Sequence, residues 1–298
     1  MQTPPSSQST PLLSILCLTY NHAAFIAQAL ESFLAQTTAF DVEVVVGDDC
    51  SSDSTLQVID GFRARFGARL RVLPSPVNLG VTRNFRRTYQ ACRGKYIAIC
   101  EGDDFWRGQT KLQAQVDFLE SHTDFVMTYH DATIVGTEGE QNVSQLPWHL
   151  RCDASSEELI ATRPISTLTV CFRNELGEVP QELDAAPALD LCLWSLLGQH
   201  GKGKYLEAVD PAGYRVHTGG VFSSQTERNR YLMTAQSLLC LARVYARQNR
   251  PETSDRLLLK AIQLSGVPLK SAAALRLLRS NMIGLILSWL HAAKRLFR

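Results

Sequence analysis

Three acidic side chains, those of Glu101, Asp103 and Asp104, follow the apolar run at residues 97–100. The run has the composition of a buried strand, so the acids stand where that strand is expected to end. Carboxylates this close repel one another unless a cation neutralises them. Oxygen ligands suit Mg²⁺ or Mn²⁺, and Mg²⁺ is usually held by one or two carboxylates together with substrate phosphates. A cation site is one interpretation of the triplet, and a solvated acidic turn is the other.

Two other predicted strands lead into polar or acidic residues in the same way. Residues 12–18 are followed by Thr19, Tyr20 and Asn21, and residues 42–46 by Gly47, Asp48 and Asp49. The carboxyl ends of parallel strands lie at one edge of a sheet, where ligands of α/β proteins bind. We therefore expect one shared site, in which Asp49 accepts hydrogen bonds from a base or a ribose. Asp103 and Asp104 would hold a cation that bridges a diphosphate.

The elements that must position these side chains alternate between strand and helix about every 25 residues over the first hundred residues. Apolar runs predict strands over residues 12–18, 42–46, 70–73 and 95–100, and helical spacing predicts helices over 24–36, 51–66 and 83–92. This order is typical of βαβ units. The predicted fold class is α/β, with helices flanking a mainly parallel central sheet.

The second half of the chain has a less regular pattern. It predicts helices over residues 111–120, 155–162 and 189–200, strands over 125–129, 132–135, 166–172 and 204–209, and a weakly apolar loop over 136–146. Helices are predicted over 231–248, 253–264 and 271–297. The predicted organisation is a disordered leader over 1–11, an α/β domain over 12–226 and a basic helical region over 227–298.

Composition and cysteine usage indicate the size of the core and the cellular compartment. Of the 298 residues, 45% are hydrophobic, which is enough for a sizeable core. The eight cysteines form no CxxC pair and predict a reducing compartment rather than a disulfide framework or a zinc site. Residues 1–11 lack the basic and apolar segments of a signal peptide, and no apolar run is long enough to span a membrane. We expect a cytoplasmic protein, which at most lies on the cytoplasmic face of the inner membrane.

The charge is divided unevenly along the chain. Residues 227–298 contain 13 Lys and Arg but only 3 Asp and Glu. Residues 1–226 contain 17 Lys and Arg and 26 Asp and Glu. Over residues 282–296 the apolar side chains share one helical face and basic ones the other, as in helices that lie in a membrane interface. An anionic membrane surface is one expected partner of this helix, and packing on the α/β domain is the alternative. No nucleic-acid partner is expected.

Five short motifs occur in a fixed order. They are LTYNH, VVVGDDCSSDST, NLG, GKYI and EGDD, which begin at residues 18, 44, 78, 94 and 101. Together, over roughly residues 12–222, they resemble the family 2 glycosyltransferases of the GT-A fold. The resemblance implies a nucleotide-diphosphate sugar donor and a divalent cation, Mn²⁺ or Mg²⁺. It makes residues 12–226 the catalytic domain.

The resemblance also assigns residues to the donor site. It implies nucleotide contacts from Thr19, Tyr20, Asn21, Asp49 and Asp103. EGDD corresponds to the DxD motif of the family, whose acids hold the cation. Its first acid is Glu101 here rather than Asp, so Asp103 and Asp104 are the expected ligands. Arg83, at the start of a predicted helix, would lie near the nucleotide or diphosphate, or else be a surface arginine; Asn84 beside it has the same two interpretations.

Residues 214–217 resemble a family segment that closes over the donor phosphates. His217 would ligate the cation or bind a phosphate, and Arg215 would pair with one. A structural histidine is the alternative. His130 and Asp131 follow the predicted strand 125–129 and are candidates to line the acceptor site.

Enzymes of this family that invert the anomeric centre need a general base for the acceptor hydroxyl. The family position of that base corresponds to Asp190, at the start of the predicted helix 189–200. The alternative is an acid favoured by the helix dipole. Asp184 is the second candidate.

The functional hypothesis is an inverting, metal-dependent glycosyltransferase that acts on a saccharide or lipid-linked saccharide, as in the synthesis of cell-surface polysaccharide or glycolipid. A non-catalytic nucleotide-sugar-binding protein and a nucleotidyltransferase are the alternatives. A nucleotidyltransferase would normally have a phosphate loop rich in Gly and in Lys or Arg after the first strand, and residues 18–23 have neither feature. A dehydrogenase is disfavoured because no GxGxxG follows that strand.

Overall fold

A computed structural model describes residues 10–136 and 139–266. The strands are β1 (Leu13–Thr19), β2 (Val42–Asp48), β3 (Leu70–Pro74), β4 (Tyr96–Ile99), β5 (Phe125–Tyr129), β6 (Ala132–Gly136), β7 (Gly139–Ser144), β8 (Cys171–Arg173), β9 (Lys202–Tyr205) and β10 (Ala212–Arg215). The α-helices are α1 (Ile26–Leu34), α2 (Thr55–Asp60), α3 (Arg63–Phe66), α4 (Val81–Ala91), α5 (Lys111–Ser121), α6 (Ser156–Ile160), α7 (Leu189–Leu197), α8 (Glu227–Arg247) and α9 (Pro251–Ser265). The predicted helix 271–297 and nearly all of the predicted leader lie outside the described residues.

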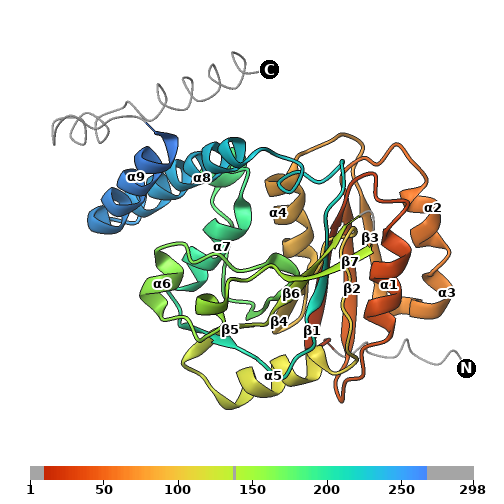
Figure 1. Cartoon of the computed structure of the whole chain (residues 1–298). Coiled ribbons are helices and arrows are strands. Elements are labelled where there is room, and N and C mark those ends of the chain that lie inside the picture. The colour runs from red at the N-terminus through yellow and green to blue at the C-terminus, as the bar shows by residue number, and fades with distance from the viewer. Residues whose placement is uncertain (1–9, 137–138, 267–298) are drawn as a thin grey trace, which may run out of the picture.

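The central sheet orders its strands β3-β2-β1-β4-β8-β5-β9 (Figure 1). The pairs β3–β2, β2–β1, β1–β4 and β5–β9 are parallel, whereas β8 runs antiparallel to both of its neighbours. A second sheet has the order β10-β6-β7. The prediction of a mainly parallel α/β sheet is therefore confirmed.

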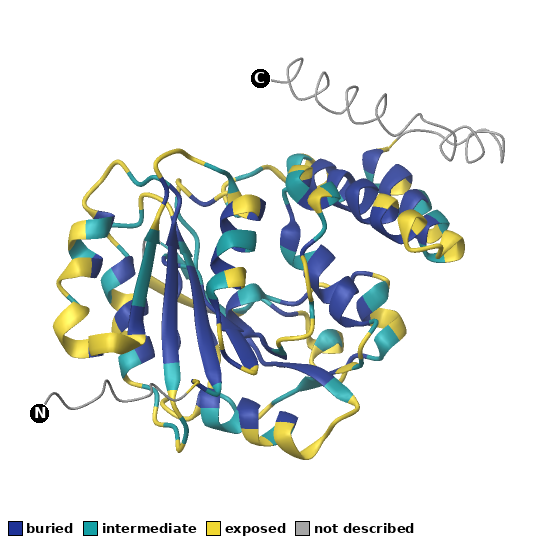
Figure 2. Cartoon of the chain, turned by 180° about the vertical axis from the view of Figure 1, so that it is seen from behind, coloured by how far each residue is buried: buried dark blue, intermediate teal, exposed yellow. Residues whose placement is uncertain are grey.

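Helices cover both faces of the central sheet because alternate side chains of a strand point to opposite sides. Ile15 and Cys17 of β1 share a core cluster with apolar residues of α1 and α5. Leu16, between them, belongs to a second cluster with residues of α4, α7 and α8. Figure 2 shows the central strands as the buried layer of the molecule. With both faces covered, the carboxyl edge of the parallel strands is left for a site.

Four predictions of local structure are corrected. The predicted loop 136–146 contains β7, an edge strand with several exposed side chains whose pairing with β6 is antiparallel. The predicted strand 166–172 is a short 3₁₀ turn followed by β8, and the strand expected over 204–209 lies at Lys202–Tyr205. The predicted helix 51–66 is divided into α2 and α3. In each case the sequence has no strong periodicity, so tertiary pairing decides the local structure.

The short strand β10 was not predicted, although it proves important for the site. Its four residues include Gly213, where a Cβ atom would lie 2.3 Å from the ring of Phe105. The close approach lets Gly213 form a backbone bridge with Phe105, just after the acidic residues. A glycine in so short a run reads as a loop, and only the packing against Phe105 shows why it is in a strand.

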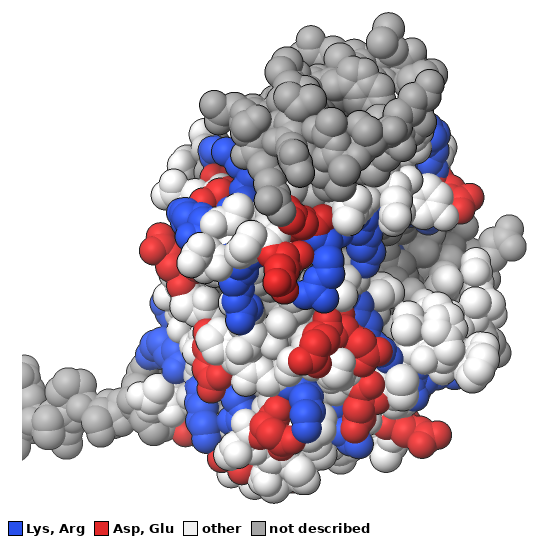
Figure 3. Space-filling model, turned by 90° about the vertical axis from the view of Figure 1, so that its left-hand side faces the viewer, with Lys and Arg blue, Asp and Glu red and all other residues white. Residues whose placement is uncertain are grey.

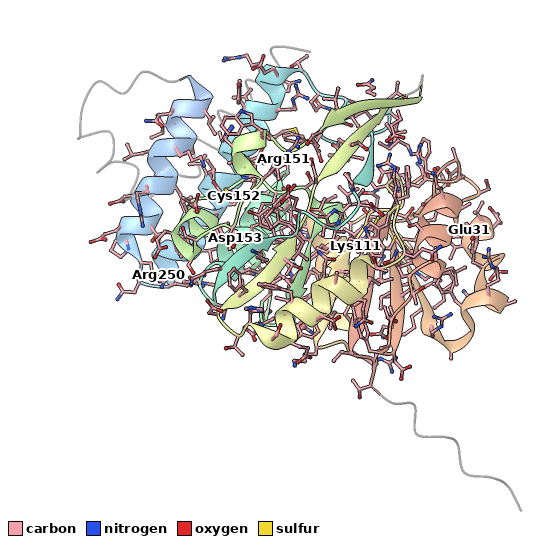
Figure 4. All side chains as sticks on the ribbon, turned by 60° about the horizontal axis from the view of Figure 1, so that its bottom comes forward. Glu31, Lys111, Arg151, Cys152, Asp153 and Arg250 are labelled. Carbon is pink, nitrogen blue, oxygen red and sulfur yellow. The ribbon has the colours of Figure 1, made fainter. Side chains whose placement is uncertain are left out.

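Helices α8 and α9 form an antiparallel pair that packs against α7. The Ser237 hydroxyl accepts a hydrogen bond from the Ala188 amide at 2.8 Å, and Ser195 and Tyr245 join their hydroxyls at 2.9 Å. Apolar residues of both helices belong to the same core cluster as strand residues. Figure 4 shows Arg250, at the turn between α8 and α9, on the opposite side of the molecule from Glu31 of α1. The described part of the C-terminal region thus shares a core with the α/β domain.

Acidic and basic side chains are interspersed on the face of the molecule shown in Figure 3. Within residues 10–136 and 139–266, no helix is both long and apolar enough to cross a membrane.

Candidate active site

The acidic loop, defined here as residues 101–104, is packed tightly against the end of β1. The Gly102 amide donates to the Leu18 carbonyl at 2.8 Å. A Cβ atom at position 102 would lie 2.8 Å from Ile26 Cδ1 and 2.9 Å from Thr19 Oγ1, so only glycine fits without displacing them. Thr19 itself is buried, and its hydroxyl has no hydrogen-bond partner among the described residues. The glycine therefore fixes where the flanking acids emerge.

Asp103 faces two histidines from distant parts of the chain. Its Oδ2 lies 3.1 Å from Nε2 of His217 and 3.7 Å from Nε2 of His22. Burial raises the pKa of Asp103, but the hydrogen bond with His217 and the charges of the two histidines outweigh it and hold the pKa below its usual value. The ligand atoms of the three residues all lie within 4.8 Å of one another. This donor set fits a divalent cation, whose ligands are typically nitrogen or oxygen atoms about 2 to 2.5 Å from the ion.

Asp104 has a different environment from Asp103. It is buried, and its Oδ1 accepts the backbone amide of Arg215 at 2.7 Å. Burial, followed by the charges of Asp103 and Glu101, raises its pKa well above the usual value. Asp104 is not a member of the histidine group, so the geometry gives it the role of joining β10 to the acidic loop. That it also ligates the cation stays a prediction.

Arg215 binds the acidic loop rather than standing free for a phosphate. Its Nε donates to the Asp103 carbonyl at 2.7 Å, and its Nη2 donates to Gln28 Oε1 at 2.6 Å. The guanidinium also lies 4.8 Å from the centre of the Phe25 ring. The expected phosphate contact of Arg215 would have to compete with these interactions.

Glu101 and Asp190 lie within electrostatic reach of each other. Burial raises the pKa of Glu101 to about 8, with smaller contributions from the charges of Asp103 and Asp190. Burial likewise raises the pKa of Asp190, at the start of α7, to about 6. Both residues are half-buried, so each keeps some contact with solvent. That Asp190 acts as the general base stays a prediction.

The loops after β1 and β2 hold each other in place. Asn21 has a positive φ of 55°, its amide donates to Ser51 Oγ at 2.9 Å, and its side chain accepts the Ser52 amide at 2.8 Å. The Asp48 carboxylate accepts the Ser51 amide at 3.0 Å. Tyr20 is exposed at the same edge. Asn21 therefore holds together the two loops of the predicted nucleotide site, and the exposed side chain of Tyr20 is available to contact a ligand.

Asp49 is buried and supports the loop that carries the NLG motif. Its two carboxylate oxygens accept the amides of Leu79 and Gly80 at 2.7 and 2.9 Å. Gly80 has a φ of 80°, which favours glycine at this turn. The structure therefore shows a loop-anchoring role for Asp49, and its contact with a base or ribose stays a prediction.

Asp184 and Arg83, two other predicted site residues, pair with each other. Arg83 Nε donates to Asp184 Oδ2 at 3.1 Å, and Arg86 donates to the other oxygen. Asn84 is buried and donates to the Gly47 carbonyl at 2.9 Å, so it supports β2. With two guanidinium partners, Asp184 joins its segment to α4, and its role as the base stays a prediction.

His130 and Asp131 do not face an open acceptor site in this structure. His130 is 1% exposed, and neither ring nitrogen has a hydrogen-bond partner among the described residues. Burial and the charge of Lys111 lower its pKa well below the usual value. The Asp131 carboxylate accepts hydrogen bonds from Ser144 Oγ and pairs with Arg151 Nε at 3.3 Å. Arg151 is labelled in Figure 4. Asp131 therefore fastens the segment after β7.

His22 is the member of the group with Asp103 and His217 that is not predicted from the sequence. The polar loop after the first strand was recognised, but histidine in such a loop is common and nothing local marks it. The backbone amide of His22 donates to Thr55 Oγ1 at 2.9 Å, which fixes the residue beside the loop after β2. Its nearness to Asp103 depends on the parallel pairing of β1 with β4, and the sequence alone does not reveal it.

Comparison with known sequences gives a match over most of the central sheet. Residues 14–176 match the model of the family described as glycosyl transferase family 2. An uncharacterised protein of Mycobacterium tuberculosis is 33% identical over 226 residues, which cover 74% of this chain and 64% of that protein. The glucosyltransferase WfaP of Escherichia coli, described as UDP-Glc:alpha-D-GlcNAc-diphosphoundecaprenol beta-1,3-glucosyltransferase, is 29% identical over 215 residues, 72% of this chain and 81% of WfaP.

Solved structures with the same fold are bound to nucleotide-sugars. Residues 1–349 of Staphylococcus aureus TarS, in complex with UDP-GlcNAc, superpose with a TM-score of 0.63 at 19% identity, over 85% of this chain and 72% of that one. The mannosyltransferase PcManGT of Pyrobaculum calidifontis, in complex with GDP-Man and Mn²⁺, gives a TM-score of 0.58 at 15% identity. The match covers 95% of this chain and 85% of PcManGT. At these identities the likeness establishes the GT-A fold.

Proposed function

Because the chain belongs to glycosyl transferase family 2, we propose that it transfers a sugar from a nucleotide-diphosphate sugar to an acceptor hydroxyl, with inversion at the anomeric carbon. The observations that carry this proposal are the family match over residues 14–176 and the cluster of Asp103 with His217 and His22 at the candidate diphosphate site; Asp190, at the start of α7, is the acid at the family's position for the base. An acid beside a candidate diphosphate site is where an inverting transferase needs its base.

The nucleotide would occupy the edge formed by the loops after β1 and β2. Tyr20 offers an exposed ring there, and Asp49 holds the Leu79–Gly80 turn that borders the edge. Thr19 and Asn21 support the first loop, and Arg83 lies on α4 with more than half of its side chain exposed. These residues would bind and orient the nucleotide, and the acidic loop would receive the diphosphate.

Asp103 and His217 would hold the divalent cation, with Asp104 behind them. When bound, such a cation neutralises the charge that develops on the departing nucleoside diphosphate. The residues of this chain provide the remaining control: Arg215 holds the acidic loop through the Asp103 carbonyl, and Gly102 keeps it close to β1. Both act by fixing the position of the leaving group.

Asp190 would remove the proton from the acceptor hydroxyl as it attacks. A carboxyl group with a pKa of about 6 is mostly ionised at neutral pH and still basic enough to accept that proton. Its carboxylate would also orient the hydroxyl opposite the leaving group, as a single displacement with inversion requires. By analogy with WfaP, we propose a saccharide carried on a lipid diphosphate as the acceptor.

The test is a panel of UDP- and GDP-sugars, each assayed with Mn²⁺, Mg²⁺ or EDTA for its effect on the unfolding temperature, followed by product analysis with lipid-linked saccharides. We expect one donor to stabilise the protein only with a cation, and Asp103→Asn to remove that dependence. Asp117→Asn, on the exposed side of α5, is the matched control and should behave like the wild type. Absence of stabilisation by every donor would contradict the proposal, and donor binding without any product would favour the non-catalytic alternative.

A further inference from the structure

We infer that His22 is a ligand of the cation together with Asp103 and His217, and that this pair of imidazoles makes the site select Mn²⁺ and similar transition-metal ions over Mg²⁺. The inference rests on the proposed function, since it takes Asp103 and His217 as cation ligands. It adds a residue from a third part of the chain and a consequence for the identity of the ion.

The first argument is geometric. Adjacent ligands of an octahedral ion with bonds of about 2.2 Å are about 3 Å apart, and opposite ligands are about 4.4 Å apart. Asp103 Oδ2 is 3.1 Å from His217 Nε2 and 3.7 Å from His22 Nε2, and the three atoms lie within 4.8 Å of one another. Shifts of less than about 1 Å would therefore bring all three onto one ion. The remaining positions would face solvent and a diphosphate, because the three side chains are 13 to 18% exposed.

The second argument is that the His22 ring packs edge-on against the rings of Phe25 and His217 but makes no hydrogen bond in the described structure. Its Nε2 is too far from Asp103 for a hydrogen bond, and its buried Nδ1 has no hydrogen-bond partner among the described residues. The backbone on either side is nevertheless fixed, since His22 donates to Thr55 Oγ1 and Ala23 to Asp53 Oδ2. The backbone thus holds His22 beside Asp103, and its Nε2 faces that carboxylate without a hydrogen bond, as a ligand that shares a cation with Asp103 would.

The third argument concerns the chemistry of the donors. Mg²⁺ prefers oxygen ligands, whereas imidazole nitrogen suits transition-metal ions. Here two of the three donor atoms are nitrogen. Asp104, which is buried with one oxygen on the Arg215 amide, and Glu101 are not members of this group. The sequence predicts Asp103, Asp104 and His217 as cation ligands, and the fold places a second imidazole, that of His22, beside Asp103 and His217.

The experiment measures cation binding by the full chain without any sugar transfer. Electron paramagnetic resonance of Mn²⁺ is recorded alone and with UDP or GDP, and Mg²⁺ is added as competitor. We compare the wild type with His22→Gln, His217→Gln and, as the matched control, His200→Gln, an exposed histidine after α7. His22→Gln should weaken Mn²⁺ binding at least about 10-fold and change Mg²⁺ binding less than about threefold, so the preference for Mn²⁺ falls. His200→Gln should match the wild type.

Pulsed measurements on the wild-type Mn²⁺ complex give a readout that does not depend on any variant folding. Magnetic coupling to two histidine nitrogens is expected, and coupling to one only would overturn the role of His22. Equal Mn²⁺ and Mg²⁺ affinities in His22→Gln and wild type would overturn it as well. If Asp103→Asn and His217→Gln also bind Mn²⁺ like the wild type, the proposed cation site itself fails. If those two lose binding while His22→Gln keeps it, only this inference fails.

Discussion

The backbone amide of Arg215 donates to Oδ1 of Asp104 at 2.7 Å, and this bond joins residues 111 positions apart. The Arg215 side chain extends the connection, because its Nε donates to the Asp103 carbonyl. Strand β10 and the acidic loop are thereby held as one unit, with His217 two residues further on against Asp103. Residues 215–217 thus reach the candidate cation site from the second sheet and the segment that follows it.

Arg215→Ala should loosen the acidic loop. It removes the hydrogen bonds to Asp103 and Gln28 and the contact with the Phe25 ring. Charge-assisted hydrogen bonds of this kind contribute about 1 to 3 kcal/mol, so we expect a loss of that size in the free energy of unfolding by urea, with weaker Mn²⁺ binding. Arg215→Lys should recover only part of the stability and of the Mn²⁺ affinity, because lysine lacks the guanidinium geometry. A variant with unchanged stability and Mn²⁺ affinity would show that the backbone bond alone suffices.

Asp190→Asn should abolish transfer and leave donor binding intact. A general base acts on the acceptor proton, so its loss should lower kcat on the order of 10²–10⁴-fold without changing the donor Kd. In the wild type, kcat/KM should rise with pH through about pH 6, since the carboxyl group of Asp190 must lose its proton to act as a base. The assay is product formation across pH 5 to 8 at saturating donor. Turnover within a few-fold of the wild type would remove Asp190 from the mechanism.

Asp184→Asn should reduce stability but retain turnover. Burial raises the pKa of Asp184, but hydrogen bonds from Arg86 and Arg83 outweigh it and hold the pKa below the usual value. A depressed folded pKa stabilises the protein above the unfolded pKa of about 3.9, and the contribution is lost as pH falls through the folded pKa. Chemical unfolding at pH 7 should show a loss of about 1 to 3 kcal/mol in the variant, shrinking toward zero below about pH 4. Lost turnover with unchanged stability would instead favour Asp184 as the base.

Asp49→Ala should weaken nucleotide binding through the loop that Asp49 supports. The variant leaves the amides of Leu79 and Gly80 without their carboxylate acceptor, at a cost of about 1 to 3 kcal/mol. Calorimetry with the nucleoside diphosphate in EDTA should show a Kd at least about 10-fold higher, because Asp49 lies at a different strand end from the cation ligands. Asp49→Asn keeps one acceptor oxygen, so its Kd should lie between those of the wild type and Asp49→Ala. An unchanged Kd in Asp49→Ala would exclude both a direct contact and this indirect role.

Removal of the residues after Gly266 should leave nucleotide binding unchanged and reduce attachment to anionic vesicles. The remaining chain keeps α8 and α9, which share the core of the α/β domain. The removed segment has basic residues and no acidic ones, so its attraction to anionic lipid should fall as salt is raised from about 50 to 500 mM. Sedimentation with phosphatidylglycerol vesicles measures this, and phosphatidylcholine vesicles are the control. Equal sedimentation of both chains would show that the segment is no membrane anchor.

The sequence by itself determined the parallel half of the sheet and the edge where the site lies. Strands β1, β2 and β4 are apolar runs buried on both faces, and such runs are recognisable without knowledge of their neighbours. The acids at their ends mark the carboxyl edge for the same reason. The place of Asp103 at this edge was therefore predictable from the chain. His217 and Asp190 came from the resemblance of the motifs to the family; His217 does meet Asp103, and the role of Asp190 stays a prediction.

Only the tertiary structure decided which side chains meet at that edge. His22 and Asp103 approach because β1 pairs with β4, and Arg215 reaches the acidic loop because Gly213 lets β10 pack against Phe105. The same holds for Asp184, whose two arginine partners come from α4. Local periodicity records how one segment is buried, whereas the partner of a side chain depends on segments far along the chain. That is why the sequence located the candidate site, and only the fold shows which side chains meet there.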